Sequence, residues 1–263
     1  MTNSAAVSGS HPVALITGAS AGIGQEFSLR LAERGYDLVL VARRRDRLEE
    51  LAARVRAAHA GLRTDIVTAD LADAAAPAQV AAEVARLGLA VDLLVNNAGF
   101  GTHGRFEEIA PEREHDEIEV NVASLVALTH AFLSGMIERR RGGVINVAST
   151  AAFQPVPYMA VYAATKAFVR SFSEALHEEV HARGVRVLAL CPGPTATEFF
   201  DTAVAKPRGP IRTVRDVVTT GLRAYDAGAA VAIDGANNQL LIASSNLIPR
   251  RWATKIAGNL MHP

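Results

Sequence analysis

Three residues near the middle of the chain are suited to proton transfer. Tyr162 and Lys166 lie four positions apart in a segment with a helical pattern, so their side chains would share one helix face. A free phenol has a pKa of about 10, and a nearby ammonium stabilises the phenolate and brings that pKa toward neutrality. Ser149 follows a buried apolar run and could donate a hydrogen bond to a substrate oxygen. The set predicts general acid/base chemistry on an oxygen, with Tyr162 exchanging the proton.

A glycine-rich turn lies between the first apolar run and a helical pattern, and its glycines have the spacing Gly-x3-Gly-x-Gly. Glycines permit a tight turn and let the backbone approach a pyrophosphate, and the helix N-terminus then offers free N–H groups. A tight turn alone could require three glycines, but the strand–turn–helix order favours a dinucleotide. The predicted binding residues here are Gly18, Ser20, Gly22, Ile23 and Gly24.

The second apolar run ends at Ala42, and Arg43 follows. Sites that prefer NAD(H) usually place a carboxylate here to bind the ribose 2′-hydroxyl. A guanidinium instead binds a 2′-phosphate. The sequence therefore predicts NADP(H), with NAD(H) as the less favoured cofactor, and assigns the 2′-phosphate to Arg43 and Ser20. Arg44 and Arg45 are interpreted as a solvated start of the next helix.

Two further strand ends carry candidate cofactor residues. Asp70 and Leu71 close the third apolar run, where the carboxylate could accept the adenine amino group or cap the next helix. After the fourth run, Asn97, Ala98 and Gly99 would let the chain pass beside the adenosine ribose, while an asparagine side chain ties neighbouring strands together.

A parallel sheet would bring all these strand ends to one edge. Short apolar runs alternate with helical patterns along the chain. The predicted strands are Val13–Thr17, Asp37–Ala42, Thr64–Thr68, Val91–Val95, Val144–Ala148, Val185–Leu190 and a seventh near Ala230–Asp234. The predicted helices are Gly22–Arg34, Asp46–His59, Glu112–Met136, Pro157 to about Arg183, and a last one ending at Met261.

The fold class predicted from this order is α/β, a Rossmann-type doubly wound parallel sheet of about seven strands with helices on both faces. Residues 12–263 form one domain, after a disordered tail at 1–11. A proline-rich stretch begins a substrate-loop region at about 192–225, which is a candidate lid or an ordinary surface loop. A C-terminal extension follows at about 238–263.

Composition narrows the class of protein. The chain has 263 residues with 27 basic and 27 acidic side chains, so no basic field predicts a nucleic-acid partner. The single cysteine fits a reducing compartment. Neither a signal peptide nor an apolar run of membrane-spanning length is evident. We expect a cytoplasmic protein, and the apolar stripes of two long helices predict a homodimer or homotetramer unless the sheet covers them.

The chain resembles the short-chain dehydrogenase/reductase family from Val13 to about Thr197. The residues that carry the resemblance are Gly18, Gly22, Gly24, the Asn96-Asn97-Ala98-Gly99 stretch, Asn121, Ser149, Tyr162, Lys166 and Pro192-Gly193. The resemblance implies hydride transfer, on the B face of the nicotinamide, between NADP(H) and a ketone, an aldehyde or the matching secondary alcohol. It also implies that Tyr162 and Lys166 contact the cofactor.

The resemblance implies further roles that the residues alone do not predict. Asn121 would distort its helix and hold a water that relays protons to Lys166. Residues bordering the nicotinamide would be Pro192, Gly193, Thr195 and Thr197. One departure is Ala21, since many NADP-using relatives have a basic residue just before the second glycine. The predicted phosphate preference therefore depends mainly on Arg43.

Apolar residues cluster near the expected nicotinamide position, and several could simply belong to the core. They are Phe100, Phe153, Val156, Met159, Phe199 and Phe200. Together with Ser149 they predict a small hydrophobic carbonyl or alcohol substrate. A second hypothesis is a regulatory protein that binds NADP but is catalytically idle.

Two other segments each have more than one possible function. His177-Glu178-Glu179-Val180-His181 matches a zinc-hydrolase motif, with Glu198 as a conceivable third ligand. A solvated polar helix face is the favoured interpretation, and no metal is predicted. The basic, Trp-containing segment from Pro249 to Trp252 opens a helix that would cover the substrate cleft, pack on a partner subunit or lie on a membrane surface.

Overall fold

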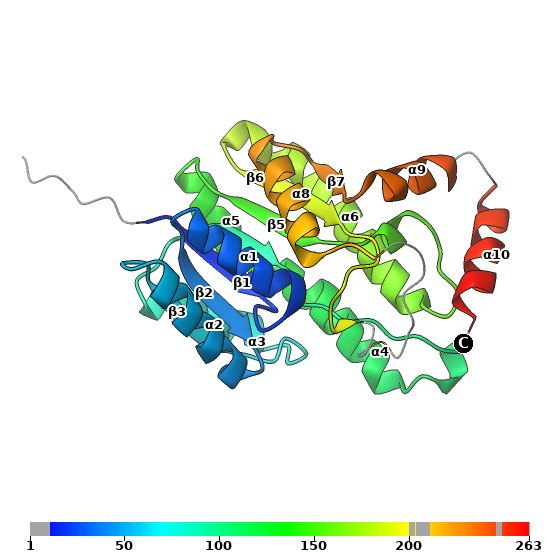
Figure 1. Ribbon diagram of the computed structural model, residues 1–263, viewed down its shortest axis with the longest axis horizontal. Coiled ribbons are helices and arrows are strands. Elements are labelled where there is room, and N and C mark those ends of the chain that lie inside the picture. Colours follow the sequence, from blue (N-terminus) through cyan, green and yellow to red (C-terminus); the bar gives the residue numbers. More distant parts are fainter. Residues whose placement is uncertain (1–10, 200–202, 204–210, 246–248, 263) are drawn as a thin grey trace, which may run out of the picture.

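Seven parallel strands form one sheet in the order β3-β2-β1-β4-β5-β6-β7 (Figure 1). This computed structural model describes residues 11–199, 203, 211–245 and 249–262. The strands are β1 (Val13–Thr17), β2 (Asp37–Ala42), β3 (Thr64–Thr68), β4 (Val91–Asn96), β5 (Gly143–Val147), β6 (Arg186–Cys191) and β7 (Val231–Ile233). The predicted Rossmann-type fold is confirmed. The predicted N-terminal tail lies, except for His11, outside the described residues.

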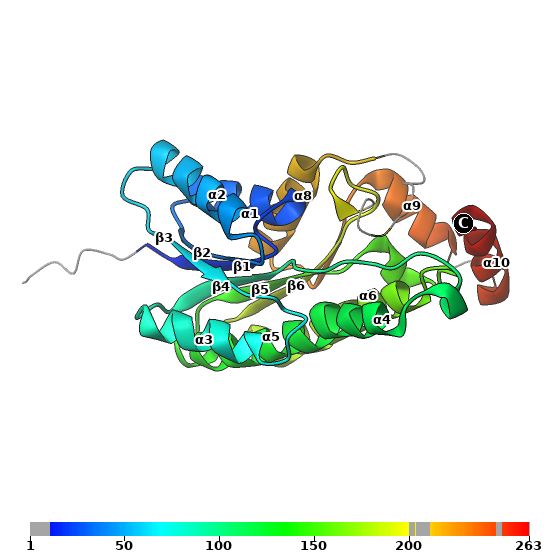
Figure 2. The same ribbon diagram turned by 90° about the horizontal axis from the view of Figure 1, so that it is seen from below.

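Helices cover both faces of the sheet (Figure 2). One layer consists of α1 (Gly22–Glu33), α2 (Arg45–Ala58) and α8 (Val214–Asp226). The opposite layer consists of α3 (Ala76–Arg86), α4 (Pro111–Ile118), α5 (Ser124–Glu138) and α6 (Ala160–Val180). Short helical turns are η1 (Phe106–Glu108), η3 (Thr150–Phe153) and η4 (His181–Arg183). Because both faces are covered, the inner strands are buried almost throughout, which explains their continuous apolar runs.

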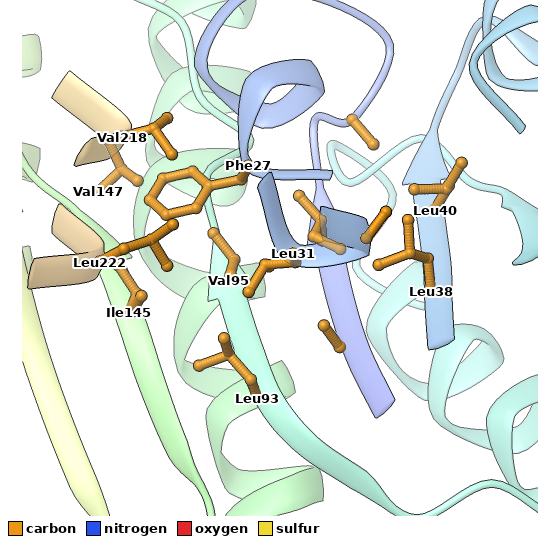
Figure 3. Packing of buried hydrophobic residues seen from close by; sticks show 14 of the residues in the cluster. Phe27, Leu31, Leu38, Leu40, Leu93, Val95, Ile145, Val147, Val218 and Leu222 are labelled. Carbon is orange, nitrogen blue, oxygen red and sulfur yellow. The ribbon is translucent and has the colours of Figure 1, made fainter. Parts of the chain in front are cut away.

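A hydrophobic core fills the space between the sheet and the α1–α8 layer (Figure 3). Phe27 of α1 is fully buried and lies beside Val218 and Leu222 of α8. A second core occupies the other face, with Leu128 and Met136 of α5 against the strands. The two cores hold the strand ends in fixed positions, which is what a site built from strand-end loops requires.

The predicted helix Glu112–Met136 is interrupted by a π-helical turn at Glu119–Ala123, termed η2, between α4 and α5. A π turn accommodates one extra residue and changes which side chains face inward. The apolar periodicity of the sequence continues through it, so the interruption was not predictable from that pattern.

Among the described residues, the stretch Pro111–Glu138 is long and apolar enough to cross a membrane by length and composition alone. Core helices of globular proteins pass the same test. Here Leu125, Leu128 and Met136 are buried in the cores beneath the sheet. These contacts place the stretch in the helical layer that covers one face of the sheet.

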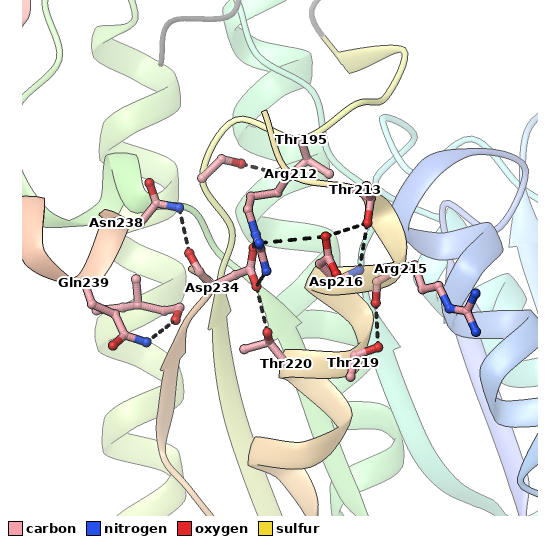
Figure 4. Close-up of polar contacts among 12 residues, drawn as sticks. Thr195, Arg212, Thr213, Arg215, Asp216, Thr219, Thr220, Asp234, Asn238 and Gln239 are labelled. Atoms are coloured by element: carbon pink, nitrogen blue, oxygen red, sulfur yellow. Dashed lines mark hydrogen bonds and ion pairs between the residues drawn. The ribbon is translucent and has the colours of Figure 1, made fainter. Parts of the chain in front are cut away.

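A buried aspartate fastens the segment after β6 to the rest of the sheet (Figure 4). Asp234, just after β7, is fully buried. Its carboxylate accepts hydrogen bonds from Arg212 Nε at 2.9 Å and Nη2 at 3.2 Å, and from Thr220 Oγ1 of α8 at 2.7 Å. The Arg212 backbone in turn pairs with residues 194 and 196. The later part of the predicted substrate-loop region is thus the helix α8 rather than a loop.

Replacing Asp234 with Ala should lower the free energy of unfolding by about 2–3 kcal/mol, because several hydrogen bonds to one buried charge are lost. Urea denaturation at neutral pH would measure the change. Asp216→Asn is the matched control, since Asp216 lies 3.8 Å from the same arginine but its side chain is 47% exposed. We expect the control to cost less than about 1 kcal/mol. Equal losses in the two variants would contradict this account.

Candidate active site

A cavity of about 620 Å³ lies at the carboxyl ends of the strands. The loops after β1, β2, β3, β4, β5 and β6 all contribute to it. The strand order reverses between β1 and β4, and in doubly wound sheets ligands bind at such a switch point. All predicted site residues in the described part of the chain line this cavity, except Gly24 and Asn121. Phe200 lies outside the described residues.

The glycine-rich turn has the geometry that a phosphate cradle needs. Gly18 and Gly22 have φ values of +65° and +55°, in the left-handed region that favours glycine. A Cβ atom on Gly24 would collide with the Gly18 carbonyl oxygen and with the Asn97 side chain. Ala21 supplies no side-chain cap to α1. The N-cap side chain therefore leaves the first N–H groups of the helix without a cap, and such groups suit an anionic ligand.

Arginines surround the predicted 2′-phosphate position, but not in the way the sequence suggested. Arg43 is largely exposed, with its Nη1 3.7 Å from Asp70 Oδ2. Arg44 instead contacts Ser20, its Nε and Nη2 lying 3.4 and 3.2 Å from Oγ. Arg44 is also the N-cap of α2 and its side chain is exposed, as expected for a solvated helix start, and the contact with Ser20 is an addition to that interpretation. Arg45 does pair with Glu49 on the exposed face of α2.

Glu198 joins the loop after β6 to the start of α2. Its carboxylate accepts hydrogen bonds from Arg47 Nη1 at 2.5 Å and Arg44 Nη1 at 2.9 Å. The hydrogen bond from Arg47, followed by the one from Arg44, holds the pKa of Glu198 below its usual value. These two guanidinium groups therefore stabilise the ionised form of Glu198.

The zinc motif is not assembled into a metal site within the described residues. The His177 ring donates from Nδ1 to the Val187 carbonyl oxygen at 2.9 Å and stacks on His181. Glu198 is engaged by arginines at the cavity. No group of three or more metal-binding side chains occurs in the part of the chain that the structure describes.

At the predicted adenosine side of the cavity, Asp70 closes a turn and does not cap the next helix, which begins at Ala76. Asp70 lines the cavity, and its Oδ1 also accepts a hydrogen bond from Ala72 N at 3.2 Å. Asn97 Nδ2 donates to the Thr17 carbonyl oxygen at 2.9 Å. Asn96 Nδ2 donates to Asn146 Oδ1 at 2.9 Å. The two asparagines thus tie β4 to β1 and to β5, which holds the cavity floor together.

The acid/base candidates meet where β5 and α6 approach one another. The Tyr162 and Lys166 side chains are both buried. Lys166 Nζ donates to the Val147 carbonyl oxygen at 2.8 Å and lies 5.8 Å from the centroid of the Tyr162 ring. Ser149 caps η3 by accepting from Ala151 N, and its hydroxyl lowers the pKa of Tyr162. The three predicted catalytic side chains therefore share one corner of the cavity.

Burial has the largest effect on the pKa values of Tyr162 and Lys166. It raises the pKa of Tyr162 to about 12, although the hydrogen bond with Ser149 lowers it. Burial also lowers the pKa of Lys166 to about 8, against an opposing effect of the nearby Glu117 carboxylate. The sequence predicted that the ammonium would bring the phenol toward neutrality. In this structure desolvation is instead the largest effect on the phenol, and Lys166 is not among the groups that shift the pKa of Tyr162.

Asn121 lies in the π turn, where it connects three elements. Its Oδ1 accepts from Phe100 N at 3.1 Å, and its Nδ2 donates to the Phe100 carbonyl oxygen at 2.9 Å and to Thr165 Oγ1 at 3.1 Å. A Cβ atom on Gly99 would come within 2.8 Å of Asn121 Oδ1 and 3.3 Å of Lys166 Nζ. The loop after β4 therefore passes directly between Asn121 and the buried ammonium.

The remaining wall of the cavity is largely apolar. It includes the predicted residues Phe100, Phe153, Val156, Met159 and Phe199. The Phe199 ring lies 5.1 Å from that of Tyr162. Two guanidinium groups cover the outer rings, Arg113 over Phe100 and Arg170 over Phe153.

The C-terminal helices complete this wall. α9 (Ala236–Ser245) and α10 (Arg250–Met261) contribute Asn238, Leu241, Ile242, Ala257, Leu260 and Met261 to the cavity. The end of α10 is attached through His103 Nε2, 2.8 Å from the Met261 carbonyl oxygen. Of the three roles considered for this segment, covering the substrate cleft agrees with these positions. No motif in the sequence identified the individual residues.

This combination defines a class of protein. A doubly wound sheet, a phosphate-binding turn at its switch point and a buried Tyr/Lys pair beside it are the parts of a dinucleotide-dependent oxidoreductase. The family model for short chain dehydrogenases matches residues 12–208. The chain therefore belongs to the short-chain dehydrogenase/reductase family.

Known relatives support this assignment. The chain is 39% identical over 180 residues to a very-long-chain 3-oxoacyl-CoA reductase of Mycosarcoma maydis. The match covers 67% of this chain and 51% of that protein, so the chain spans about half the length of this relative.

Solved structures are also similar. A short-chain dehydrogenase from Sphingobium yanoikuyae in complex with NADPH is 33% identical, with a TM-score of 0.81 over 90% of this chain and 94% of that one. A bulky-bulky ketone specific alcohol dehydrogenase from Comamonas testosteroni is 32% identical, with a TM-score of 0.77 over 90% and 93%.

Proposed function

We propose that this protein is an NADP(H)-dependent oxidoreductase that reduces a hydrophobic ketone or aldehyde, or oxidises the matching secondary alcohol, with Tyr162 as general acid/base. The observation that carries the proposal is the shared cavity. The phosphate-binding turn, Ser149, Tyr162 and the buried Lys166 all line this one cavity of about 620 Å³.

The cavity fits a phosphorylated dinucleotide. Its cradle has no room for a Cβ atom at Gly24, and arginines lie on the side where a 2′-phosphate would bind. We assign the pyrophosphate to the turn from Gly18 to Gly24 and the 2′-phosphate to Ser20, Arg43 and Arg44. The nicotinamide end is assigned to Pro192, Gly193, Thr195 and Thr197. When bound, the nicotinamide supplies the hydride for reduction or accepts it in oxidation.

Side chains of the protein donate and accept the proton. In the reducing direction, Tyr162 donates its phenolic proton to the substrate oxygen as negative charge develops there. Ser149 stabilises the same oxygen by a hydrogen bond. Lys166 places a positive charge near the resulting phenolate, which offsets part of the desolvation penalty. In the oxidising direction the same groups act in reverse, and the phenolate accepts the proton.

The apolar wall favours a bulky hydrophobic substrate. Five predicted apolar residues and the inner faces of α9 and α10 line the cavity. The relatives act, by their names, on very-long-chain 3-oxoacyl-CoA and on bulky-bulky ketones. We therefore propose a carbonyl flanked by long or bulky apolar groups. We also propose that the protein is cytoplasmic and homo-oligomeric.

A substrate screen tests these proposals together. Purified protein would be mixed with NADPH or NADH and a panel of ketones that runs from small charged keto acids to bulky apolar diketones and 3-oxoacyl thioesters. We expect NADPH absorbance to fall fastest with the bulky apolar compounds. Tight NADPH binding without turnover on any of them would favour the idle regulatory alternative. Stoichiometric zinc and inactivation by a chelator would favour the hydrolase alternative.

A further inference from the structure

Glu117 of α4 is a fully buried carboxylate next to the acid/base corner. One of its oxygens, Oε2, accepts two hydrogen bonds from Thr102, from the backbone N at 3.0 Å and from Oγ1 at 2.7 Å. The other oxygen, Oε1, is buried and has no hydrogen-bond partner among the described residues. A buried carboxylate satisfied on only one side is costly when ionised. Packing alone therefore does not account for a glutamate at this position.

Glu117 of α4 and Asn121 of the π turn both hold the loop after β4. They lie four positions apart, and Asn121 holds the backbone of Phe100 by hydrogen bonds to its N and O. Glu117 holds Thr102, two residues further along. Between them, a Cβ atom on Gly101 would come within 3.0 Å of the Tyr162 ring. The loop 99–102 is thus held at Phe100 and at Thr102, on either side of the residue that packs on Tyr162.

Lys166 and Glu114 are the charged side chains that affect the protonation of Glu117. Lys166 on α6 favours the ionised carboxylate, and Glu114 on α4 disfavours it. Burial is the largest effect and raises the pKa of Glu117 to about 7, although the hydrogen bonds from Thr102 lower it. In return, the carboxylate charge raises the pKa values of Lys166 and Tyr162. Glu117 therefore gains and loses its proton in the range in which enzymes operate.

We propose that Glu117 is a positioning residue of the acid/base site: with Asn121 it clamps the loop 99–102, and by taking up or releasing a proton it changes the charge that Tyr162 and Lys166 experience. This inference rests on the proposed function, because it assumes that these two residues perform the proton transfer. The proton moves between the Glu117 carboxyl group and solvent, and no other bond changes.

The pH profile of Glu117→Gln tests the proposal. Glutamine keeps an acceptor oxygen for Thr102 but carries no charge. Without the negative charge, the pKa values of Tyr162 and Lys166 fall. The alkaline limit of ketone reduction and the acidic limit of alcohol oxidation should both move to lower pH by about 0.5–1 unit. An inflection of kcat/KM near pH 7 should be present in the wild type and absent in the variant.

Thr102→Val provides a second test, because it should raise the pKa of Glu117 without removing the carboxylate. It removes the Oγ1 donor while keeping the backbone N–H, so the Glu117 proton should be held more tightly and the inflection should move to higher pH. Glu112→Gln is the matched control, because Glu112 is an exposed glutamate of the same helix and should leave the profile unchanged.

The outcomes separate the two proposals. If Glu117→Gln and Thr102→Val keep the wild-type profile while Tyr162→Phe abolishes turnover, the role of Glu117 is overturned and the proposed function stands. If Tyr162→Phe retains full turnover, the proposed function itself fails. Loss of activity in Glu117→Gln together with an unmoved inflection in Thr102→Val would also overturn the proton-dependent role.

Discussion

Replacing Tyr162 with Phe is expected to lower kcat for ketone reduction by about 10²–10⁴-fold, the range that a positioned general acid contributes. The ring can keep its contact with Phe199, so folding and NADPH binding should be nearly unchanged. The loss should therefore fall on the chemical step. Steady-state kinetics with the best ketone from the screen, together with NADPH titration by fluorescence, would measure both quantities.

Ser149→Ala serves as a graded comparison for that variant. It removes one hydrogen bond to the substrate oxygen and should cost about 10²–10³-fold in kcat. A phenylalanine variant with wild-type turnover would refute the assigned acid/base role. Loss of NADPH binding along with activity would show instead that the substitution disturbs the cavity.

The second large effect concerns the cofactor. Replacing Arg43 and Arg44 together with Ala should raise KM for NADPH by about 10–100-fold, because hydrogen bonds between charged groups at the 2′-phosphate are lost. NADH lacks this phosphate, so its KM should change by less than about threefold. The ratio of kcat/KM for the two cofactors is the quantity to measure.

Single substitutions would divide this effect between the two arginines. The structure places Arg44 on Ser20 and leaves Arg43 exposed, so we expect Arg44→Ala to have at least half of the combined effect. Arg45→Ala is the matched control, since Arg45 pairs with Glu49 away from the cavity. A double variant with unchanged NADPH preference would contradict the assignment of the 2′-phosphate to this cluster.

Local patterns in the sequence predicted most of the framework. The strands were placed within one or two residues of their observed bounds, because a strand buried on both faces is apolar throughout. The glycine-rich turn was found because it follows a strand and precedes a helix. The Tyr162/Lys166 pair was found because helical spacing makes neighbours of residues four positions apart.

The rest of the site depends on contacts between distant segments, which no local pattern records. The contact of Arg44 with Ser20 and the burial of Glu117 each depend on how segments from different strands meet. The helix distortion at Asn121 was expected only from the family resemblance, and the π turn lies at that residue. Burial also reversed the expected direction for the phenol pKa, because desolvation follows from the whole fold. For the C-terminal segment, covering the cleft was one of three roles considered, but its individual lining residues were not identified, since the resemblance ends near Thr197.

The position of α9 and α10 has a consequence for how this molecule could change its substrate. The residues assigned to hydride and proton transfer all precede Glu198, whereas both C-terminal helices follow β7 and supply part of the opposite wall. We expect that side chains there, such as Leu241 and Leu260, can be enlarged or shortened without displacing the proton donor or the phosphate cradle, because they lie on separate helices. Selectivity can therefore diverge through the last thirty residues of the chain while the chemistry stays the same.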